Sequence, residues 1–288
     1  MNLLPANLIL EGGALRGIFT AGVLDALDEK NLLFEFVIGV SAGSCMGVSY
    51  VSRQKGRSSK ITLTYCNDRR YFSWQNLLRE GNLFSIKFSY EAIPRTLVPF
   101  DYKAFEQSPQ RFIAVATDCA TGKPVYFENN TPERKKDMTT EIRASSSMPF
   151  VSKPVEINGR MYLDGGITDS IPVEYSMQHG HAKSIVVRTR PRGYRKKEKA
   201  SLLPIFKFLF PKYPELAKAL SQRSINYNHE ADLIDKLEAE GKCLVIYLPE
   251  DIKAGRLERD RSKLEALYQA GYQAGLNYAE KLPTFLNL

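Results

Sequence analysis

Phe34-Glu35-Phe36-Val37-Ile38-Gly39-Val40-Ser41-Ala42-Gly43 is an apolar run that ends in the pattern Gly-x-Ser-x-Gly. Its β-branched and aromatic residues predict a buried strand, and the small residues that follow are compatible with a helix. A strand-to-helix corner is sharp and crowded, so glycine is needed at Gly39 and Gly43, where a Cβ would collide with the neighbouring strand and helix. This corner would present the Ser41 hydroxyl as a nucleophile.

A glycine-rich loop precedes this corner. Leu8 to Leu10 predicts a short buried strand, after which comes Glu11-Gly12-Gly13-Ala14-Leu15-Arg16-Gly17 and then a helical apolar pattern. Unpaired backbone N–H groups at the start of a helix favour a negative charge. We therefore predict an oxyanion hole built from the backbone of Gly12, Gly13, Ala14, Arg16 and Gly17.

A loop for a nucleotide phosphate is the alternative interpretation of the same residues. The dinucleotide pattern requires a third glycine where this chain has Ala14, and the Lys-Ser/Thr ending of a P-loop is missing. We therefore predict no nucleotide cofactor.

A carboxylate follows a strand-like segment far downstream. Met161-Tyr162-Leu163 continues into Asp164-Gly165-Gly166, and the two glycines would let another part of the chain approach closely. Asp164 is therefore a candidate base. A plain Asp-Gly turn is the alternative, because this dipeptide is common in hairpins.

Taken in this order, the three motifs resemble those of the patatin-like phospholipase family: a glycine-rich loop after the first strand, a Gly-x-Ser-x-Gly elbow and a distant Asp-Gly-Gly. The similarity extends to Arg143-Ala144-Ser145-Ser146-Ser147-Met148-Pro149 and to Ile171-Pro172-Val173, on either side of Asp164. With Leu257-Glu258-Arg259-Asp260 it covers nearly the whole chain and looks like a bacterial branch.

The resemblance implies a lipid acyl hydrolase that uses a serine and an aspartate without a histidine. Ser41 would attack the ester carbonyl of a lipid or phospholipid, Asp164 would accept its proton, and water would then hydrolyse the acyl-enzyme. Two residues depart from the family pattern: Ala14 stands in place of the third glycine, and Glu11 stands where many relatives have aspartate. A positive φ at Ala14 would cost about 1 to 2 kcal/mol. Arg16 is a candidate partner for Glu11.

A Ser-His-Asp esterase of the α/β-hydrolase type is an alternative mechanism. It requires a histidine after the acid, and His179 and His181 follow Asp164 in that order. Their polar surroundings, like those of His229, favour surface positions instead.

The fold prediction is an α/β protein with a mainly parallel sheet. Short strand-like runs alternate with helical stretches, which indicates a sheet covered on both faces. The predicted strands are centred on 8–10, 36–40, 112–116, 125–127, 155–157, 161–163, 185–187 and 244–248. The resemblance implies the three-layer αβα patatin-like form with a helical cap or lid.

We predict one domain over residues 1–288, because the chain is 43% hydrophobic and no long linker divides it. Its core would span about 5–190, a helical cap or lid 200–240, and a final strand with a C-terminal helix 243–288.

Cysteine spacing and targeting signals are sparse. The four cysteines and three histidines show no metal-ligand spacing, so no metal is predicted. The N-terminus lacks a secretory h-region, and no apolar run approaches the roughly 20 residues that a membrane span requires. We therefore expect a cytoplasmic protein. The segment from Arg188 to Phe210 suggests that it also binds peripherally to the inner face of the membrane.

Residues 188–199 carry seven basic residues and one acidic residue, which account for +6 of the net charge of +8. The apolar stretch 202–210 follows directly, and basic residues beside bulky apolar ones bind anionic bilayers. Arg188 to Phe210 is therefore a candidate membrane contact. Packing as a lid is the alternative, since Pro204 and Pro211 interrupt a long amphipathic helix.

Two non-enzymatic interpretations stay open. The basic segment 188–199 could bind nucleic acid, but it lacks interleaved aromatics other than Tyr194, so no nucleic-acid partner is expected. A lipid-binding protein without turnover is favoured only by Ala14. Candidate acyl-pocket residues, for which ordinary core packing is the alternative, are Tyr71, Phe72, Trp74, Leu83, Phe84, Ile86 and Phe88.

Overall fold

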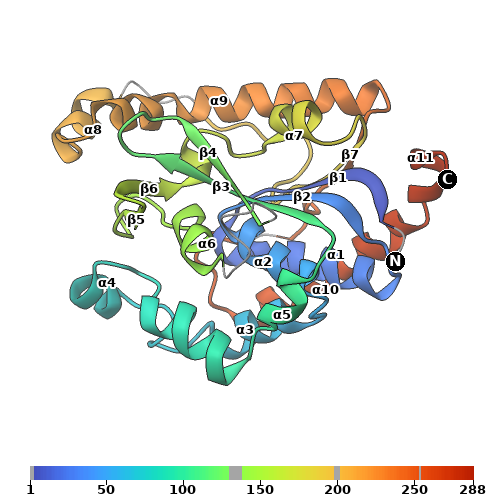
Figure 1. Cartoon of the computed structure of the whole chain (residues 1–288), viewed down its shortest axis with the longest axis horizontal. Helices are drawn as coiled ribbons and strands as arrows, with labels where there is room; N and C mark the ends of the chain where they lie inside the picture. Colours follow the sequence, from blue (N-terminus) through green and yellow to red (C-terminus); the bar gives the residue numbers. More distant parts are fainter. Residues whose placement is uncertain (1–2, 130–137, 198–201, 253) are drawn as a thin grey trace.

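The computed structural model describes residues 3–129, 138–197, 202–252 and 254–288, and it has three layers (Figure 1). Helices α7 (Val173–His179) and α9 (Pro214–Ala239) cover one face of the central sheet. Helices α1 (Ile18–Glu29), α2 (Ala42–Val51) and α10 (Arg261–Ala279) lie on the other face. The predicted αβα arrangement is therefore confirmed.

The described part of the chain forms an eight-stranded sheet in the order β5-β6-β3-β2-β1-β7-β8, with β4 paired to β3. The strands are β1 (Leu4–Leu10), β2 (Phe34–Val40), β3 (Arg111–Asp118), β4 (Pro124–Glu128), β5 (Val155–Ile157), β6 (Arg160–Asp164), β7 (Ser184–Val187) and β8 (Cys243–Ile246). Strands β3, β2, β1, β7 and β8 are parallel to one another, while β4, β5 and β6 pair in antiparallel fashion. The sheet is therefore mixed and mainly parallel, as the strand pattern predicts.

Shorter helical elements connect these layers. They are η1 (Ala14–Gly17), α3 (Arg57–Tyr65), α4 (Trp74–Glu80), the π-helix η2 (Lys87–Leu97), α5 (Tyr102–Glu106), α6 (Thr139–Ser145), η3 (Gly165–Ile167), α8 (Leu203–Leu209) and α11 (Leu282–Leu286). Side chains set several of the starts: Ser73 accepts a hydrogen bond from Asn76 N at the beginning of α4, and Asp260 caps α10.

Alternation along the strands builds two cores. In β1, Leu8 and Leu10 face the α1, α2 and α10 layer, whereas Ile9 faces the α9 layer, and all three side chains are buried. Burying each such side chain contributes about 1.5 to 3 kcal/mol. Both faces are apolar, which is why the central strands read as nearly continuous hydrophobic runs.

Helix α9 is part of the outer layer, although the sequence-based division placed residues 200–240 in a cap. Its Tyr227, Ile234 and Leu237 are buried in the same core cluster as β1 and β2. Of that segment, α8 alone lies at one end of the molecule (Figure 1), where Phe206 packs beside Phe150 with ring centroids 6.0 Å apart. The division into core, cap and terminal segment stays a prediction. Among the described helices, none has the length and apolar content to cross a membrane.

Candidate active site

Strand β3 brings Ser41 and Asp164 together. One edge of β3 pairs with β4, and its opposite edge is shared by β2 and β6, one after the other. Along that shared edge Val40 lies opposite Val115, and Asp164 lies opposite the next residue, Ala116. Because Ser41 directly follows Val40, the pairing register places it beside Asp164, although the two are far apart in sequence.

Ser41 occupies a strained corner between β2 and α2. Its backbone has φ 55° and ψ −123°, a conformation that costs a non-glycine residue about 1 to 3 kcal/mol. A Cβ on Gly39 would lie 2.5 Å from Ser44 N, and one on Gly43 would lie 2.2 Å from Leu10 O. Both glycines are therefore required by close backbone approach, as the sequence pattern predicts.

A second serine, Ser145 of α6, holds this corner in place. The Ser41 N–H donates to Ser145 Oγ at 3.0 Å. Ser44 Oγ lies 2.6 Å from Ser41 O and 3.1 Å from Ser145 Oγ, which ties α2 to α6. Ser145 is fully buried. The sequence places Ser145 in a family-like motif but indicates no role for it, because its partner Ser41 is more than 100 positions away.

The Asp164 carboxylate is buried and lines the same polar cavity as Ser41. It accepts a hydrogen bond from Gly166 N at 2.8 Å, while Thr117 Oγ1 donates to the Asp164 main-chain oxygen at 2.9 Å. Burial raises the pKa of Asp164 above its ordinary value, and the nearby Ser41 hydroxyl and the Arg223 charge partly oppose that rise. The carboxylate is therefore more basic than a free aspartate, which suits a proton acceptor.

The glycine-rich loop lies next to both residues. Gly12, Gly13 and Ala14 line the same small polar cavity as Ser41 and Asp164. Within the described chain, the Gly13 and Ala14 N–H groups donate to no backbone oxygen, so they are available to a negatively charged oxygen. Ala14 has φ 50°, so this position carries the strain of about 1 to 2 kcal/mol expected for a residue with a Cβ.

Two members of the predicted oxyanion hole differ from Gly13 and Ala14 in their surroundings. The Arg16 N–H donates to Gly13 O at 3.2 Å, within the turn of η1. Gly17 is absent from the lining of the polar cavity, and a Cβ there would lie 2.8 Å from Ala42 Cβ. The cause is local, because η1 begins at Ala14 and the Arg16 N–H is used within its turn. A part for Gly17 in the oxyanion hole stays a prediction.

Glu11 pairs with Arg188 and not with Arg16, the partner that sequence reasoning suggested. Its Oε2 accepts from Arg188 Nε at 3.1 Å and from Thr189 N at 2.7 Å, and its Oε1 accepts from Tyr227 OH at 2.7 Å. β1 and β7 are neighbouring parallel strands, so the residues after their carboxyl ends meet. This network fixes the start of the glycine loop.

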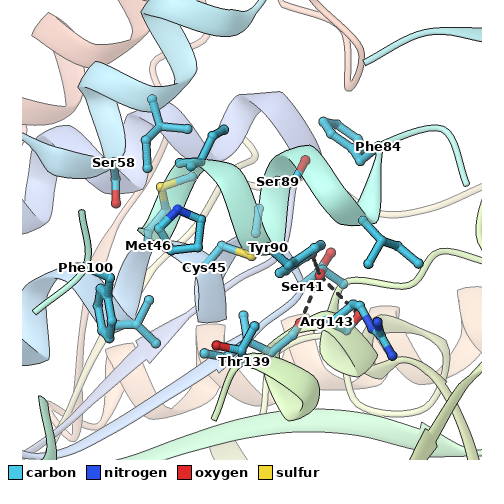
Figure 2. A pocket seen from close by; sticks show the side chains of 18 of the residues that line it. Ser41, Cys45, Met46, Ser58, Phe84, Ser89, Tyr90, Phe100, Thr139 and Arg143 are labelled. Carbon is cyan, nitrogen blue, oxygen red and sulfur yellow. Dashed lines mark hydrogen bonds between the residues drawn. The ribbon is translucent and has the colours of Figure 1, made fainter. Parts of the chain in front are cut away.

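An apolar cavity of about 200 Å³ extends from Ser41. Figure 2 shows Ser41 on one side of it, with Ser58 and Phe100 on the far side and Met46 between them. Of the predicted acyl-pocket residues, Tyr71, Phe84 and Ile86 line the cavity. Phe72, Leu83 and Phe88 are instead buried packing residues, and Trp74 is exposed.

Cys45 also lines the apolar cavity but is unsuited to replace Ser41 as nucleophile. Burial raises the pKa of its thiol to about 11, so it stays protonated at neutral pH. Among the described residues, no group of histidine, cysteine or acidic side chains is arranged to hold a metal ion.

A smaller polar cavity of about 50 Å³ is also lined by Ser41. It shares Ala14, Ser41 and Met148 with the apolar cavity. Its basic lining residues are Arg16, Arg190, Lys196, Arg223 and Arg256, and its acidic ones are Glu11 and Asp164. The sequence does not indicate that these basic residues lie close together.

No histidine lines either cavity in the described part of the chain. His181 Nε2 lies 2.9 Å from Glu35 Oε2, near the amino end of β2, whereas Ser41 follows the carboxyl end of that strand. His179 stacks on Tyr175, and His229 is exposed on α9. The alternative Ser-His-Asp triad therefore has no imidazole at the candidate site.

The basic segment 188–199 is not a free positive patch. Arg188 pairs with Glu11, Arg192 with Glu238 at 2.6 Å, and Arg195 with Asp232 and Asp235 on α9. These acidic residues neutralise much of the charge that the sequence concentrates there. The membrane contact predicted for Arg188 to Phe210 stays a prediction. Residues 198–201 lie outside the described residues.

The fold and this site define a class of α/β proteins that present a serine at a strand-to-helix elbow. A family model described as patatin-like phospholipase matches residues 8–177. The chain belongs to the patatin-like phospholipase family. A second family model, described as a domain of unknown function (DUF6363), matches residues 213–287.

Known relatives span different lengths. The uncharacterized protein YjjU of Escherichia coli is 33% identical over 189 residues, which are 64% of this chain and 52% of that protein. Lysophospholipase nte1 of Aspergillus terreus is 24% identical over 297 residues, which are 96% of this chain but 18% of that protein. The crystal structure of VipD from Legionella pneumophila superposes with a TM-score of 0.48 at 12% identity, covering 96% of this chain and 67% of VipD. The chain thus spans about half of YjjU and less than a fifth of nte1.

Proposed function

We propose that the protein is a lipid acyl hydrolase in which Ser41 and Asp164 form the catalytic dyad. The observation that carries this proposal is the pairing register that sets Ser41 beside the buried Asp164 carboxylate, where both residues and the available N–H groups of Gly13 and Ala14 line one cavity. The apolar cavity that opens at Ser41 supports an acyl chain as the group held there. The proposed substrates are lipid or phospholipid esters.

In the first half-reaction, Ser41 Oγ attacks the ester carbonyl while its proton moves to Asp164. The oxyanion is held by the Gly13 and Ala14 N–H groups, and one such donor is typically worth about 3 to 4 kcal/mol of transition-state stabilisation. The intermediate then collapses. The alcohol leaves with the proton from Asp164, and the acyl group stays on Ser41.

In the second half-reaction, Asp164 takes a proton from water as the water attacks the acyl-enzyme. The second oxyanion collapses, the fatty acid leaves, and the proton returns from Asp164 to Ser41 Oγ. Burial of Asp164 helps both steps, because it raises the basicity of the carboxylate toward an alcohol or water.

Labelling by a fluorophosphonate probe tests this proposal directly. The probe reacts with an activated serine, so it should label the wild-type protein and leave Ser41→Ala unlabelled. A lipid-binding protein without turnover would not be labelled in either form. Labelling that persists in Ser41→Ala would assign the nucleophile to another residue.

Met46→Trp should shorten the acyl chains that the enzyme accepts. Met46 lines the apolar cavity on the side away from Ser41, near Ser58 and Phe100, so a larger ring there would fill the far end (Figure 2). We expect kcat/KM for p-nitrophenyl palmitate to fall about tenfold or more relative to p-nitrophenyl butyrate, because several buried methylenes would lose contact. An unchanged chain-length profile would place the acyl chain elsewhere.

Exposed apolar residues on α4 and α8, two helices that lie toward the same end of the molecule in Figure 1, are the candidates for membrane contact. Leu78 and Phe208 are 88% and 83% exposed, and Ile205 is 54% exposed. We propose that the surface carrying these residues touches lipid, because large exposed apolar side chains favour an interface.

Ile205→Ser with Phe208→Ser should therefore reduce co-sedimentation with phosphatidylglycerol vesicles several-fold. Phe206 is left in place because it packs beside Phe150. Leu288→Ser, an exposed leucine at the opposite end of the molecule, is the matched control. Equal sedimentation of the double variant and this control would reject the surface as a lipid contact.

A further inference from the structure

The polar cavity beside Ser41 collects positive charge from four separate parts of the chain. Arg16 comes from η1, Arg190 and Lys196 from the segment after β7, Arg223 from α9, and Arg256 from the segment between β8 and α10. Such convergence keeps like charges close together, which is unfavourable unless an anion joins them.

These cations are held in position by the backbone around them. Leu15 N donates to Arg256 O at 3.0 Å, which fixes the Arg256 segment beside the glycine loop. Asn228 of α9 bonds both Lys196 N and Lys196 O, at 2.8 and 3.0 Å. Arg223 Nε donates to Gly166 O at 2.6 Å, next to the Asp164 motif. The arrangement is built before any ligand arrives.

The same cations lack carboxylate partners. Among the described ion pairs, none joins Arg16, Arg190, Lys196, Arg223 or Arg256 to an acidic side chain. Arg16 is buried, and its Nε has no hydrogen-bond partner. Of the two acids in the lining, Glu11 is paired with Arg188, and Asp164 lies close enough to Arg223 and Arg256 for their charges to lower its pKa. Four arginines therefore share one carboxylate that no ion pair holds, which leaves an excess of positive charge in the cavity.

The pKa of Lys196 is lowered in this cavity. Burial lowers the pKa of its ammonium group to about 6, and the Arg223 charge lowers it further in the same direction. Its Nζ lies 3.8 Å from the centre of the Tyr227 ring. A dianion in the cavity would favour the charged form of this lysine.

We propose that this cavity binds the phosphate of the substrate head group, so that the enzyme prefers acyl esters of glycerol phosphate that end in a free phosphomonoester. The inference rests on the proposed function, because Ser41 lines both the acyl cavity and the polar cavity. An ester held at Ser41 would place its acyl chain on one side and its phosphate on the other.

Size and charge favour a phosphomonoester over larger head groups. A volume of about 50 Å³ holds roughly four water-sized groups, so it admits a compact group beside the oxyanion position and excludes a bulky head group. Arginine forks pair well with phosphate oxygens, often through two hydrogen bonds. A choline would add a cation beside four arginines, and a neutral glycerol would leave those arginines without an anion.

The inference also assigns a function to the C-terminal part of the chain. Arg190, Lys196, Arg223 and Arg256 all lie beyond residue 177, where the patatin-like phospholipase match ends. Arg223 and Arg256 lie within residues 213–287, the segment matched by the model of unknown function. That segment would supply head-group selection to a hydrolytic core that precedes it.

The test compares three oleoyl esters as substrates of the full chain: lysophosphatidic acid, lysophosphatidylcholine and monooleoylglycerol, each below its micelle threshold. We expect kcat/KM for lysophosphatidic acid to exceed the other two values by about tenfold or more. Arg190→Gln with Arg256→Gln should reduce that preference about tenfold. Arg192→Gln, in the same segment but paired with Glu238 outside the cavity, should leave it unchanged.

A second arm measures inorganic phosphate as an inhibitor of p-nitrophenyl butyrate hydrolysis, to separate a head group from free phosphate. Competitive inhibition together with the lysophosphatidic acid preference supports the proposal. Inhibition without that preference identifies a free-phosphate site and overturns the head-group assignment. If the double variant does not fold, the wild-type preference and inhibition still decide.

The two levels of the proposal fail in different ways. Hydrolysis of all three esters at similar rates overturns the head-group inference and leaves the lipid hydrolase standing. Absence of hydrolysis of every ester, together with absence of fluorophosphonate labelling, overturns both.

Discussion

Replacing Ser41 with alanine is expected to reduce kcat/KM for ester hydrolysis by about four orders of magnitude or more. The substitution removes the atom that forms the acyl-enzyme, and the remaining N–H donors can stabilise only an uncatalysed attack by water. Neighbouring groups offer no substitute, since burial raises the pKa of the Cys45 thiol to about 11. The measurement is initial-rate kinetics on p-nitrophenyl butyrate with purified protein.

The matched control is Ser262→Ala, an exposed serine in the first turn of α10. It should retain wild-type rates and stability, which separates loss of the nucleophile from loss of a hydroxyl in general. The Ser41→Ala protein should also melt near the wild-type temperature, because alanine, like serine, carries a Cβ and keeps the same strained backbone conformation. Full activity in Ser41→Ala would end the assignment.

Asp164→Asn should cause a loss of about 10³-fold or more, with the shape of the side chain preserved. The amide can still accept a hydrogen bond from Gly166 N, but it cannot take the proton from Ser41. Asp101→Asn is the control, because asparagine also caps a helix and Asp101 caps α5 on the exposed surface. A wild-type rate in Asp164→Asn would exclude Asp164 as the base.

The pH profile gives an independent measurement of the same residue. Asp164 acts as a base only when ionised, so kcat/KM should fall as pH falls through its pKa in the free enzyme. Burial raises that pKa, so the acidic limb should lie above the value of about 3.9 of an unperturbed aspartate. An acidic limb at or below that value would contradict the buried carboxylate as the base.

The secondary structure followed well from local pattern. The apolar runs around Ile9, Ile38 and Val186 are strands because short β-branched runs bounded by glycine or polar residues satisfy both faces of a covered sheet. The elbow glycines were equally readable, since a Cβ at Gly43 would meet Leu10 O at 2.2 Å. Steric demands of this kind act over a few residues, so they leave a trace in the sequence.

The oxyanion loop was only partly predictable. Its position after β1 follows from the glycine run, but which N–H groups stay available depends on where the chain starts to coil. Arg16 N–H is used inside η1, while the Gly13 and Ala14 N–H groups have no acceptor in the described chain. The partner of Glu11 was likewise hidden, because Arg188 reaches it only through the pairing of β1 with β7.

The charge distribution was the least predictable feature. Sequence alone shows a concentrated basic segment at 188–199, but acidic residues of α9 neutralise Arg192 and Arg195, and Arg190 and Lys196 turn into the polar cavity. Electrostatic energy depends on distance in space, and these acidic partners lie 37 to 46 positions away in the chain.

Short-range sterics and hydrophobic periodicity thus specify the strands, the elbow and the glycine loop from the order of residues alone. The meeting of Ser41 with Asp164, the role of Ser145 and the cluster of cations arise only when β3 aligns β2 with β6 and α9 closes over the sheet. Hydrogen bonds and charges between distant segments require a folded register to bring them within a few ångströms, and that register is a property of the whole sheet.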